Sequence, residues 1–356
     1  MSRYDSSLWM QDIDEVIKAN SMVREFQGKS ILVTGASGLI GAAVIDVLIR
    51  LNETKPASEN FIRIYAAGRA EDRMRERFAH YFGKEYFCFV SYDANDPEPS
   101  FSEPFDYVIC AAGNSSPDLF SKEPVETMLS NVLGVSVLLK KAKQNKSRLL
   151  YVSSSEIYGK AQFSEPILEE QTGTIALLNP RNAYAIGKQA GEATCAAFCA
   201  EYGTEAVIVR PGHVYGPTAL QNDGHVVSLW LREAAKKKDL CMKSQGLQMR
   251  SYCHCLDCAT AILTVLLKGD SCQAYNVSNA SSNVMLCQMG KMIAERGGVS
   301  LVTEVASLEE KRRFNPMEYS VLNNEKLFGL GWNGIFDVQK GIAHTLRIYG
   351  ENKDLA

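Results

Sequence analysis

Tyr184 and Lys188, four residues apart, could carry out acid–base chemistry on a hydroxyl group. Residues at this spacing lie on one face of a helix. A cation beside a phenol favours the ionised form, so Lys188 is expected to lower the pKa of Tyr184 from its usual value of about 10. The tyrosine could then remove a hydroxyl proton while the carbon loses hydride. Taken alone, the pair could equally be two solvated residues of a helix.

A glycine-rich turn lies near the N-terminus. Residues 30–33 have the composition of a buried strand, residues 34–41 form the turn, and the apolar spacing of a helix follows. Strand, turn and helix in this order are the context of a dinucleotide-binding fingerprint. Gly35 would permit the tight turn, Gly38 the approach of a pyrophosphate, and Gly41 close packing of helix on strand, with the helix N-terminus receiving the negative charge. The alternative is an ordinary turn with incidental glycines.

The G-x-x-G-x-x-G spacing, the Tyr184–Lys188 pair and the serine run at residues 153–155 resemble the extended short-chain dehydrogenase/reductase superfamily. Its members include nucleotide-sugar epimerases, dehydratases and decarboxylases. The resemblance implies an α/β fold with a Rossmann-type doubly wound parallel sheet and a smaller C-terminal substrate-binding lobe. The alternation of strand and helix patterns from Ser30 to about Leu178 also predicts such a sheet.

The resemblance implies a set of cofactor-binding positions in the family's order along the chain. Asp93 follows a predicted strand and would lie by the adenine. The implied positions are Gly35, Ser37, Gly38, Leu39, Ile40, Gly41, Arg69, Asp93, Ala94, Ala111, Ala112, Gly113, Asn131, Tyr184, Lys188, Pro211 and His213.

The second predicted strand ends in Gly68-Arg69, without the acidic residue that usually holds the adenine ribose in NAD enzymes. Arg69 could instead meet the 2′-phosphate of NADP, or stack on the adenine. A redox-neutral enzyme that regenerates its cofactor typically uses tightly held NAD. NAD is therefore the expected cofactor, with NADP as the alternative.

The residues around Glu156 separate the subfamilies. Aligned on Tyr158-Gly159, Ser154 occupies the catalytic Ser/Thr position of the superfamily. In dTDP-glucose 4,6-dehydratases the next two residues are Asp and Glu, because loss of water needs an acid and a base, whereas 4-epimerases usually lack the second carboxylate. Ser155-Glu156 is similar to the pair in UDP-glucuronate decarboxylases, also called UDP-xylose synthases.

The approach to the tyrosine, Asn-Pro-Arg-Asn-Ala-Tyr at residues 179–184, supports the same subfamily. The decarboxylases carry Pro-Arg-x-x-Tyr here. A guanidinium three residues before the base could hold a sugar carboxylate bidentately. Alternatively, Arg181 is a surface residue at the start of the helix.

Two later stretches complete the resemblance. Residues 223–228 read Asp-Gly-His-Val-Val-Ser, close to the decarboxylases' Asp-Gly-Arg-Val-Val-Ser, which implies that Val227 borders the nucleotide. Arg250, in Gln-Met-Arg-Ser-Tyr, is implied to reach the sugar diphosphate or the reacting centre. His213 stands where the family has Asn, so the diphosphate contact would differ, or His213 only packs beside the cofactor.

The expected reaction is therefore decarboxylation of UDP-glucuronate through a 4-keto intermediate. The expected catalytic residues are Ser154, Glu156, Tyr184, Lys188 and Arg250, the expected substrate contacts are Ser155, Arg181, His213, Val227 and Arg250, and no metal is expected. The alternatives are a nucleotide-sugar 4,6-dehydratase or 4-epimerase, an NADP-dependent nucleotide-sugar reductase, and a non-catalytic nucleotide-sensing subunit.

Composition restricts the partners. Hydrophobic residues make up 46% of the 356 residues and charged residues 22%, which is ordinary for a globular enzyme. The net charge is −3 and there is no basic block, so nucleic acid and membrane surfaces are not expected partners. No stretch has the length of a membrane span or the pattern of a signal peptide. The expected location is the cytoplasm.

Ten cysteines at irregular spacing are expected to be small buried hydrophobes. The run at residues 253–258, Cys-His-Cys-Leu-Asp-Cys, lacks the second half-site that a zinc centre needs. Asp257 is instead expected to cap the helix that follows it.

The expected organisation is an N-terminal helical extension (1–28), a mainly cofactor-binding domain (29–215) and a mainly substrate-binding lobe (216–356) from which the chain crosses back. The extension could pack on the edge of the sheet or on a second subunit. Residues 52–60 are expected to form a surface loop. A homodimer is expected from the resemblance, through helices that include the Tyr184 helix, although its apolar residues Ala193, Ala196, Ala197 and Phe198 would also fit a helix buried within one subunit.

Overall fold

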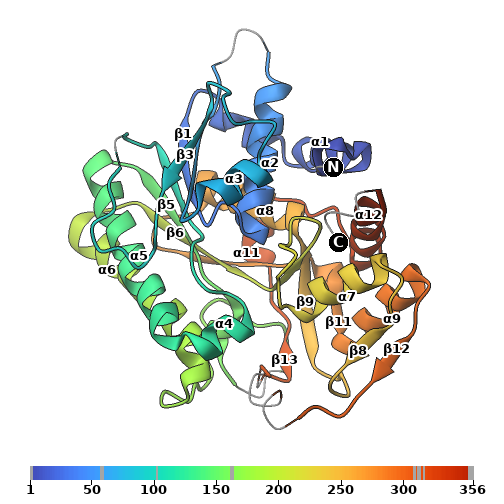
Figure 1. The fold of residues 1–356 in the computed structure, drawn as a ribbon. Helices are drawn as coiled ribbons and strands as arrows, with labels where there is room; N and C mark the ends of the chain where they lie inside the picture. The colour runs from blue at the N-terminus through green and yellow to red at the C-terminus, as the bar shows by residue number, and fades with distance from the viewer. Residues whose placement is uncertain are drawn as a thin grey trace.

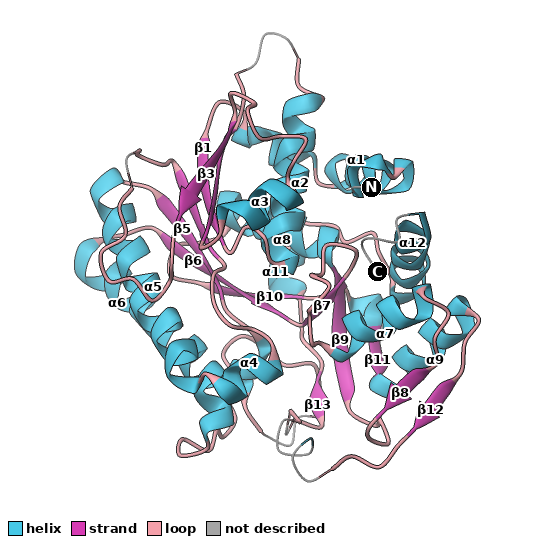
Figure 2. Ribbon diagram, in the orientation of Figure 1, coloured by secondary structure: helices cyan, strands magenta, loops and turns pink. Residues whose placement is uncertain are grey.

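A seven-stranded parallel sheet lies at the centre of the larger part of the molecule (Figures 1 and 2). The computed structural model describes residues 3–56, 60–101, 103–160, 164–307, 310, 314–315 and 317–351. The strand order is β10-β6-β5-β4-β1-β2-β3, and every pairing is parallel. The strands are β1 (Ser30–Thr34), β2 (Arg63–Gly68), β3 (Phe87–Ser91), β4 (Tyr107–Cys110), β5 (Arg148–Val152), β6 (Ala206–Pro211) and β10 (Ala274–Val277). The predicted doubly wound sheet is confirmed.

Helices cover both faces of this sheet (Figure 1). The alternation of side chains along β1 shows how the faces are divided. Ile31 and Val33 pack into the hydrophobic cluster that contains residues of α2 and α8, whereas Leu32 packs into the cluster that contains residues of α5 and α6. The helices around the sheet are α2 (Leu39–Glu53), α3 (Glu71–Arg77), α4 (Pro117–Lys122), α5 (Pro124–Asn145), α6 (Ala183–Tyr202), α8 (Cys255–Lys268) and α11 (Glu325–Phe328).

A smaller lobe has its own hydrophobic cluster. In its four-stranded sheet, β9 pairs with β7, β11 and β13, and β8 pairs with β12 separately. Its elements are β7 (His213–Tyr215), α7 (Val226–Ala235), β8 (Leu240–Met242), β9 (Met249–His254), β11 (Asn283–Met285), α9 (Leu286–Gly297), β12 (Leu301–Thr303), β13 (Tyr319–Ser320) and α12 (Val338–Glu351). Between them, α8 and β10 return to the large sheet.

The N-terminal extension packs on the helical layer of its own chain rather than on the edge of the sheet. It comprises η1 (Arg3–Asp5), α1 (Ser7–Ala19) and η2 (Ser21–Phe26), and α1 contacts α2, α8 and α12. Asp46 of α2 is fully buried and accepts hydrogen bonds from three residues of the extension. Arg3 makes an ion pair with it at 2.7 Å, and Tyr4 and Trp9 donate hydrogen bonds at 2.5 and 3.2 Å. The extension is thus fixed to the helix that follows the glycine turn.

Replacing Asp46 should destabilise the protein strongly. Asp46→Ala leaves the buried Arg3 guanidinium without its partner, which typically costs about 3–5 kcal/mol in the free energy of unfolding. Asp14→Ala is the matched control, because its ion pair with Arg50 is partly solvated and worth about 1 kcal/mol or less. Urea unfolding of both variants checks the difference. Equal losses would show that the buried network does not anchor the extension.

Two local predictions are wrong. The expected loop at residues 52–60 begins later, because α2 continues to Glu53 and the buried Asn52 exchanges two hydrogen bonds with the backbone of Ile62; residues 57–59 lie outside the described residues. His254 rather than Asp257 caps α8, since β9 runs directly into the helix. Asp257 is buried and accepts hydrogen bonds from the backbone of residues 335 and 336.

Most cysteines are buried or partly buried as expected, but Cys88 and Cys272 are exposed. Cys253, Cys255 and Cys258 belong to the hydrophobic core of the large domain. In the described part of the chain, no helix combines the length and apolarity needed to cross a bilayer.

Candidate active site

The glycine turn connects β1 to α2 at the carboxyl edge of the large sheet. Gly35 has φ of +65°, and a Cβ there would lie 2.6 Å from the carbonyl oxygen of Ala111. A Cβ at Gly41 would lie 2.4 Å from the Gly35 carbonyl oxygen. Gly38 caps α2 without a side-chain hydrogen bond and has only that carbonyl within 4 Å of a would-be Cβ, at 3.2 Å. The free amides of the helix start therefore face an open cradle, which fits a dinucleotide pyrophosphate.

Gly41→Ala should weaken cofactor binding. Its Cβ would force the turn away from the Gly35 carbonyl, and overpacking of this kind typically costs about 1–3 kcal/mol, or roughly tenfold and upward in affinity. Gly350→Ala is the control, because Gly350, like Gly41, has no positive φ, and a Cβ there meets nothing within 4 Å. Titration of each variant with NAD+ by calorimetry checks the prediction. Unchanged affinity in Gly41→Ala would contradict the assigned role of the turn.

The other predicted cofactor positions follow the carboxyl ends of neighbouring strands. Because these ends meet at one edge of a parallel sheet, the residues gather on the side of the glycine turn. Arg69 comes directly after β2 and is exposed. The remaining positions are Ser37, Leu39 and Ile40 at the start of α2, Asp93 and Ala94 after β3, Ala111, Ala112 and Gly113 after β4, and Pro211 and His213 at the end of β6 and in β7.

The Asn131 side chain makes hydrogen bonds within the protein. Its Oδ1 accepts a hydrogen bond from the Tyr151 hydroxyl at 3.0 Å, and its Nδ2 donates to the Thr127 carbonyl at 2.8 Å. The Lys188 ammonium lies 4.9 Å from the centre of the Tyr151 ring. Asn131 thus positions the ring beneath Lys188.

Tyr184 and Lys188 lie on one face of α6, as their spacing predicts, and both are buried. The Lys188 ammonium donates a hydrogen bond to the Val152 carbonyl at 2.7 Å and lies 5.8 Å from the centre of the Tyr184 ring. The Ser154 hydroxyl is close enough to the Tyr184 phenol to hydrogen-bond it. The structure therefore brings together the serine, tyrosine and lysine.

The predicted direction of the Tyr184 pKa is wrong. Burial raises the pKa to about 12, and the hydrogen bond to Ser154 and the charge of Arg181 offset this only in part. Burial also lowers the pKa of Lys188 to about 8. Desolvation of the phenol therefore outweighs the positive charge near it.

Glu156 and Arg181 form a buried ion pair beside Tyr184. Two guanidinium nitrogens of Arg181 contact the two carboxylate oxygens of Glu156 at 2.8 and 3.3 Å, and Asn315 donates to the same carboxylate at 3.2 Å. Glu156 belongs to η3 (Ser155–Tyr158), whose N-terminus Ser154 caps, and Arg181 to η4 (Pro180–Asn182). Arg181 is 7% exposed, so it is not the surface residue that the sequence left open. Its Nε is buried and has no partner among the described residues.

Phe120 of α4 is a site residue that the sequence did not indicate. Its buried ring stacks on the Tyr184 ring with centres 5.0 Å apart and planes inclined by 16°. The Arg181 guanidinium carbon lies 5.2 Å from the centre of the same ring. Phe120 contributes to the burial that raises the Tyr184 pKa.

Arg250 and His213 lie in the adjoining strands of the smaller lobe. Arg250 is buried and donates hydrogen bonds to the carbonyls of Met249, Met317 and Glu318. Burial, with the charges of Arg250 and His225, lowers the pKa of His213 to about 3. His213 is therefore neutral near pH 7, and its buried Nδ1 has no partner within the described ranges. Such an atom could accept a hydrogen bond from a ligand.

His225 is a further titratable group close to His213, although the sequence indicated only neighbouring residues as site residues. Its Nδ1 lies 2.5 Å from a carboxylate oxygen of Asp223, and this contact outweighs burial and raises the His225 pKa. The charge of Glu156 acts in the same direction. Val227, by contrast, packs into the hydrophobic cluster of the smaller lobe.

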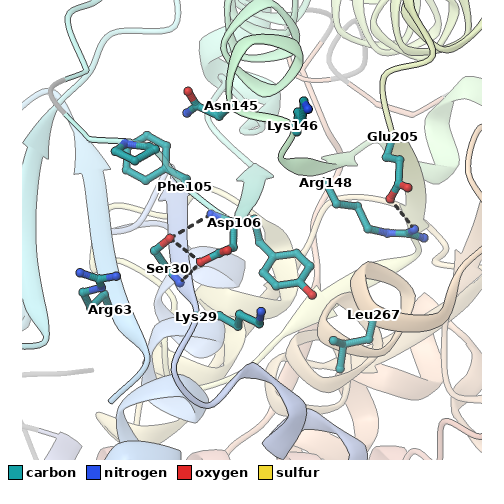
Figure 3. A pocket seen from close by; sticks show the side chains of 12 residues that line it. Lys29, Ser30, Arg63, Phe105, Asp106, Asn145, Lys146, Arg148, Glu205 and Leu267 are labelled. Carbon is teal, nitrogen blue, oxygen red and sulfur yellow. Dashed lines mark hydrogen bonds and ion pairs between the residues drawn. The ribbon is translucent and has the colours of Figure 1, made fainter. Parts of the chain in front are cut away.

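A groove of about 530 Å³ lies at the opposite edge of the large sheet (Figure 3). Ser30, Tyr107 and Arg148, which line it, are the first residues of β1, β4 and β5. Within it, Asp106 accepts hydrogen bonds from Ser30, and Arg148 pairs with Glu205 at 3.0 Å. None of the predicted site residues lines this groove.

A sequence model of the NAD dependent epimerase/dehydratase family matches residues 31–278. The chain belongs to this family. The match covers the glycine turn, the strands β4 and β5 that precede Ala111 and Ser154, and the whole of α6, so the geometry described above is that of an enzyme family acting on nucleotide sugars.

Individual relatives represent more than one reaction. UDP-glucuronic acid decarboxylase 1 of Xenopus tropicalis is 26% identical over 324 residues, covering 90% of this chain and 72% of that protein. UDP-glucuronic acid decarboxylase 6 of Arabidopsis thaliana is 29% identical, covering 72% of this chain and 71% of that protein. The dTDP-D-glucose 4,6-dehydratase of Bos taurus is 27% identical, covering 91% and 89%.

Solved structures support the fold. An epimerase from Methanothermobacter thermautotrophicus superposes with a TM-score of 0.81 at 20% identity, covering 95% of this chain and 96% of that chain. The dTDP-glucose 4,6-dehydratase of Bacillus anthracis, in complex with NAD, gives 0.75 at 19% identity, covering 92% and 98%. These structural similarities establish the arrangement of helices and strands. The reaction has to be inferred from the site residues.

Proposed function

We propose that the protein decarboxylates UDP-glucuronate through a 4-keto intermediate. The observation that carries the proposal is the buried Glu156–Arg181 pair, in contact with the ring that stacks on Tyr184. A guanidinium held in this place, with one donor unpaired, suits a substrate that carries a carboxylate. The decarboxylase relatives at 26–29% identity support the same reaction.

The residues around the glycine turn fit NAD. The start of α2 would hold the pyrophosphate at Gly38, and Asp93 would lie by the adenine. Bound NAD+ would supply a hydride acceptor and a positive charge beside Tyr184. NAD is the proposed cofactor because the overall reaction needs no external reductant, and the exposed Arg69 leaves NADP as the alternative.

Tyr184 would act as the base that takes the proton of the sugar 4-hydroxyl. Its pKa of about 12 must fall in the working complex, and an added positive charge has the required sign. Ser154 would hydrogen-bond the same oxygen and stabilise the developing carbonyl. Lys188 would remain bound to the Val152 carbonyl as the cation of the site.

The carboxylate end of the sugar would lie at Arg181, Glu156 and Ser155. Oxidation at carbon 4 produces a β-keto acid, which loses carbon dioxide because the ketone accepts the electrons as an enolate. Arg250 would stabilise this enolate, and Tyr184 would protonate it. His213, through its free Nδ1, would contact the diphosphate side of the substrate.

A 4,6-dehydratase is the second candidate. Glu156 places a carboxylate beside Tyr184, as loss of water from a neighbouring carbon would require, and one relative is a dehydratase. Ser155, where dehydratases carry the acid, and the buried Arg181 favour the decarboxylase. A 4-epimerase does not require a carboxylate at the position of Glu156. An NADP-dependent reductase would consume one cofactor for each turnover.

We also propose a cytoplasmic homodimer. Ala193, Ala196 and Ala197 of α6 are exposed, whereas Phe198 packs against the core of its own subunit, so of these four residues the alanines alone form an exposed face of α6. Together with the exposed Val125 and Leu129 of α5, it would form the dimer contact. The division into a cofactor domain (29–215) and a substrate lobe (216–356) is likewise proposed.

The substrate test compares UDP-glucuronate, UDP-glucose and dTDP-glucose, each with NAD+ and with NADP+. Mass spectrometry of the products should show loss of one carbon dioxide from UDP-glucuronate and no change in the neutral sugars. Loss of water from dTDP-glucose would instead make the protein a dehydratase. Steady consumption of added NADPH would make it a reductase, and no reaction with UDP-glucuronate would exclude the proposal.

A further inference from the structure

Two cysteines from different elements meet at the edge of the large sheet. Cys199 lies in the last turn of α6, and Cys272 lies two residues before β10. Both contact the carbonyl oxygen of Ala206, the first residue of β6. The Cys199 Sγ is 4.0 Å from this oxygen, and the backbone N–H of Cys272 donates to it at 2.6 Å. The two thiols are also within hydrogen-bonding reach of each other.

The two thiols differ in their access to solvent. Cys272 is exposed and Cys199 is partly buried. Cys195, one turn earlier on α6, is fully buried against the sheet. Cys272 also has φ of +63°, in a region that residues other than glycine seldom occupy. An accessible thiol beside a second, sheltered thiol is the arrangement in which an oxidised sulfur is captured as a disulfide.

We propose that Cys199 and Cys272 are a modification site, at which peroxide produces a reversible disulfide that joins α6 to the start of β10. The Cys272 thiolate attacks hydrogen peroxide, so that one S–O bond forms, the O–O bond breaks, and hydroxide leaves and takes up a proton. The Cys199 thiol then attacks the sulfenic sulfur, forming the S–S bond with loss of water. Two thiols and one peroxide become one disulfide and two waters, and a dithiol reductant reverses the change.

The rate of the reaction should depend on pH. Burial and the neighbouring Cys199 raise the pKa of Cys272, so little thiolate is present near neutrality. Below that pKa the thiolate fraction, and with it the rate of oxidation, should rise about tenfold for each pH unit. The site would therefore respond to sustained rather than brief exposure to peroxide.

The test treats the full-length protein with hydrogen peroxide, alkylates the remaining thiols, and maps the peptides without reduction. We expect a Cys199–Cys272 cross-link that dithiothreitol removes, and an intact mass lower by about two hydrogens. The linkage encloses the segment between residues 199 and 272, so the oxidised protein should also melt at a higher temperature.

Three variants separate the outcomes. Cys272→Ser and Cys199→Ser should each abolish the cross-link, and Cys88→Ser is the matched control, because Cys88 is the other exposed cysteine. The cross-link should form at the same rate in Cys88→Ser as in the wild type. Sulfinic acid at Cys272 with Cys199 still open to alkylation would overturn the proposal, as would a disulfide that joins Cys272 to another cysteine. Every readout is independent of enzymatic activity.

Discussion

Tyr184→Phe should lose turnover by about 10²- to 10⁴-fold while it still binds NAD+. The substitution keeps the ring that stacks on Phe120 at 5.0 Å and removes only the oxygen that would accept the proton. Because the phenol is buried, bulk water has little access to the place where it would act as the base. The measurement is kcat with UDP-glucuronate beside a calorimetric titration with NAD+.

Tyr202→Phe is the matched control, because Tyr202 is an exposed tyrosine at the end of the same helix. It should leave kcat and cofactor affinity unchanged. If Tyr184→Phe kept more than a tenth of the wild-type kcat, the base would have to be another group. Loss of NAD+ binding in Tyr184→Phe would mean that the variant does not report on proton transfer.

Arg181→Met should abolish release of carbon dioxide and lower the free energy of unfolding by roughly 3–5 kcal/mol. Both effects have the same origin. The guanidinium pairs with Glu156 at 2.8 Å, with the two side chains only 7% and 17% exposed, so its removal leaves a poorly solvated carboxylate without a counter-ion. The same guanidinium is the proposed contact of the substrate carboxylate.

The double variant Arg181→Met/Glu156→Gln separates stability from catalysis. Since it removes both charges, it should recover most of the lost stability but none of the carbon dioxide release. Glu205→Gln is the control, because its pair with Arg148 is 60% exposed on the glutamate side and worth little. Normal carbon dioxide release from the double variant would remove Arg181 and Glu156 from the proposed mechanism.

The parts of the site that local backbone rules govern could be predicted from the sequence. Gly35 and Gly41 were assigned correctly to close backbone approaches, because no side chain fits where a strand, a turn and a helix meet so tightly. The shared face of Tyr184 and Lys188 followed from the helical repeat. The parallel sheet followed from the alternation of strand and helix patterns.

Features that depend on packing between distant segments could not be predicted. The Glu156–Arg181 pair joins residues 25 positions apart, and the stack of Phe120 on Tyr184 joins residues that α5 and β5 separate in the chain. The sign of the Tyr184 pKa shift depends on the balance between burial and nearby charge. The spacing of two residues in the sequence does not reveal that balance. The position of the N-terminal extension likewise depends on Asp46, a buried acidic residue among the apolar residues of α2.

The central claim is that UDP-glucuronate loses carbon dioxide through an enolate formed next to a carbon-4 ketone. The most direct measurement is the turnover of UDP-glucuronate with NAD+ in deuterated water, with the product examined by NMR. The account predicts a UDP-linked pentose, or its 4-keto form, with one solvent deuterium at the carbon that carried the carboxylate. A product that keeps its carboxylate, or a pentose without solvent deuterium at that carbon, would contradict it.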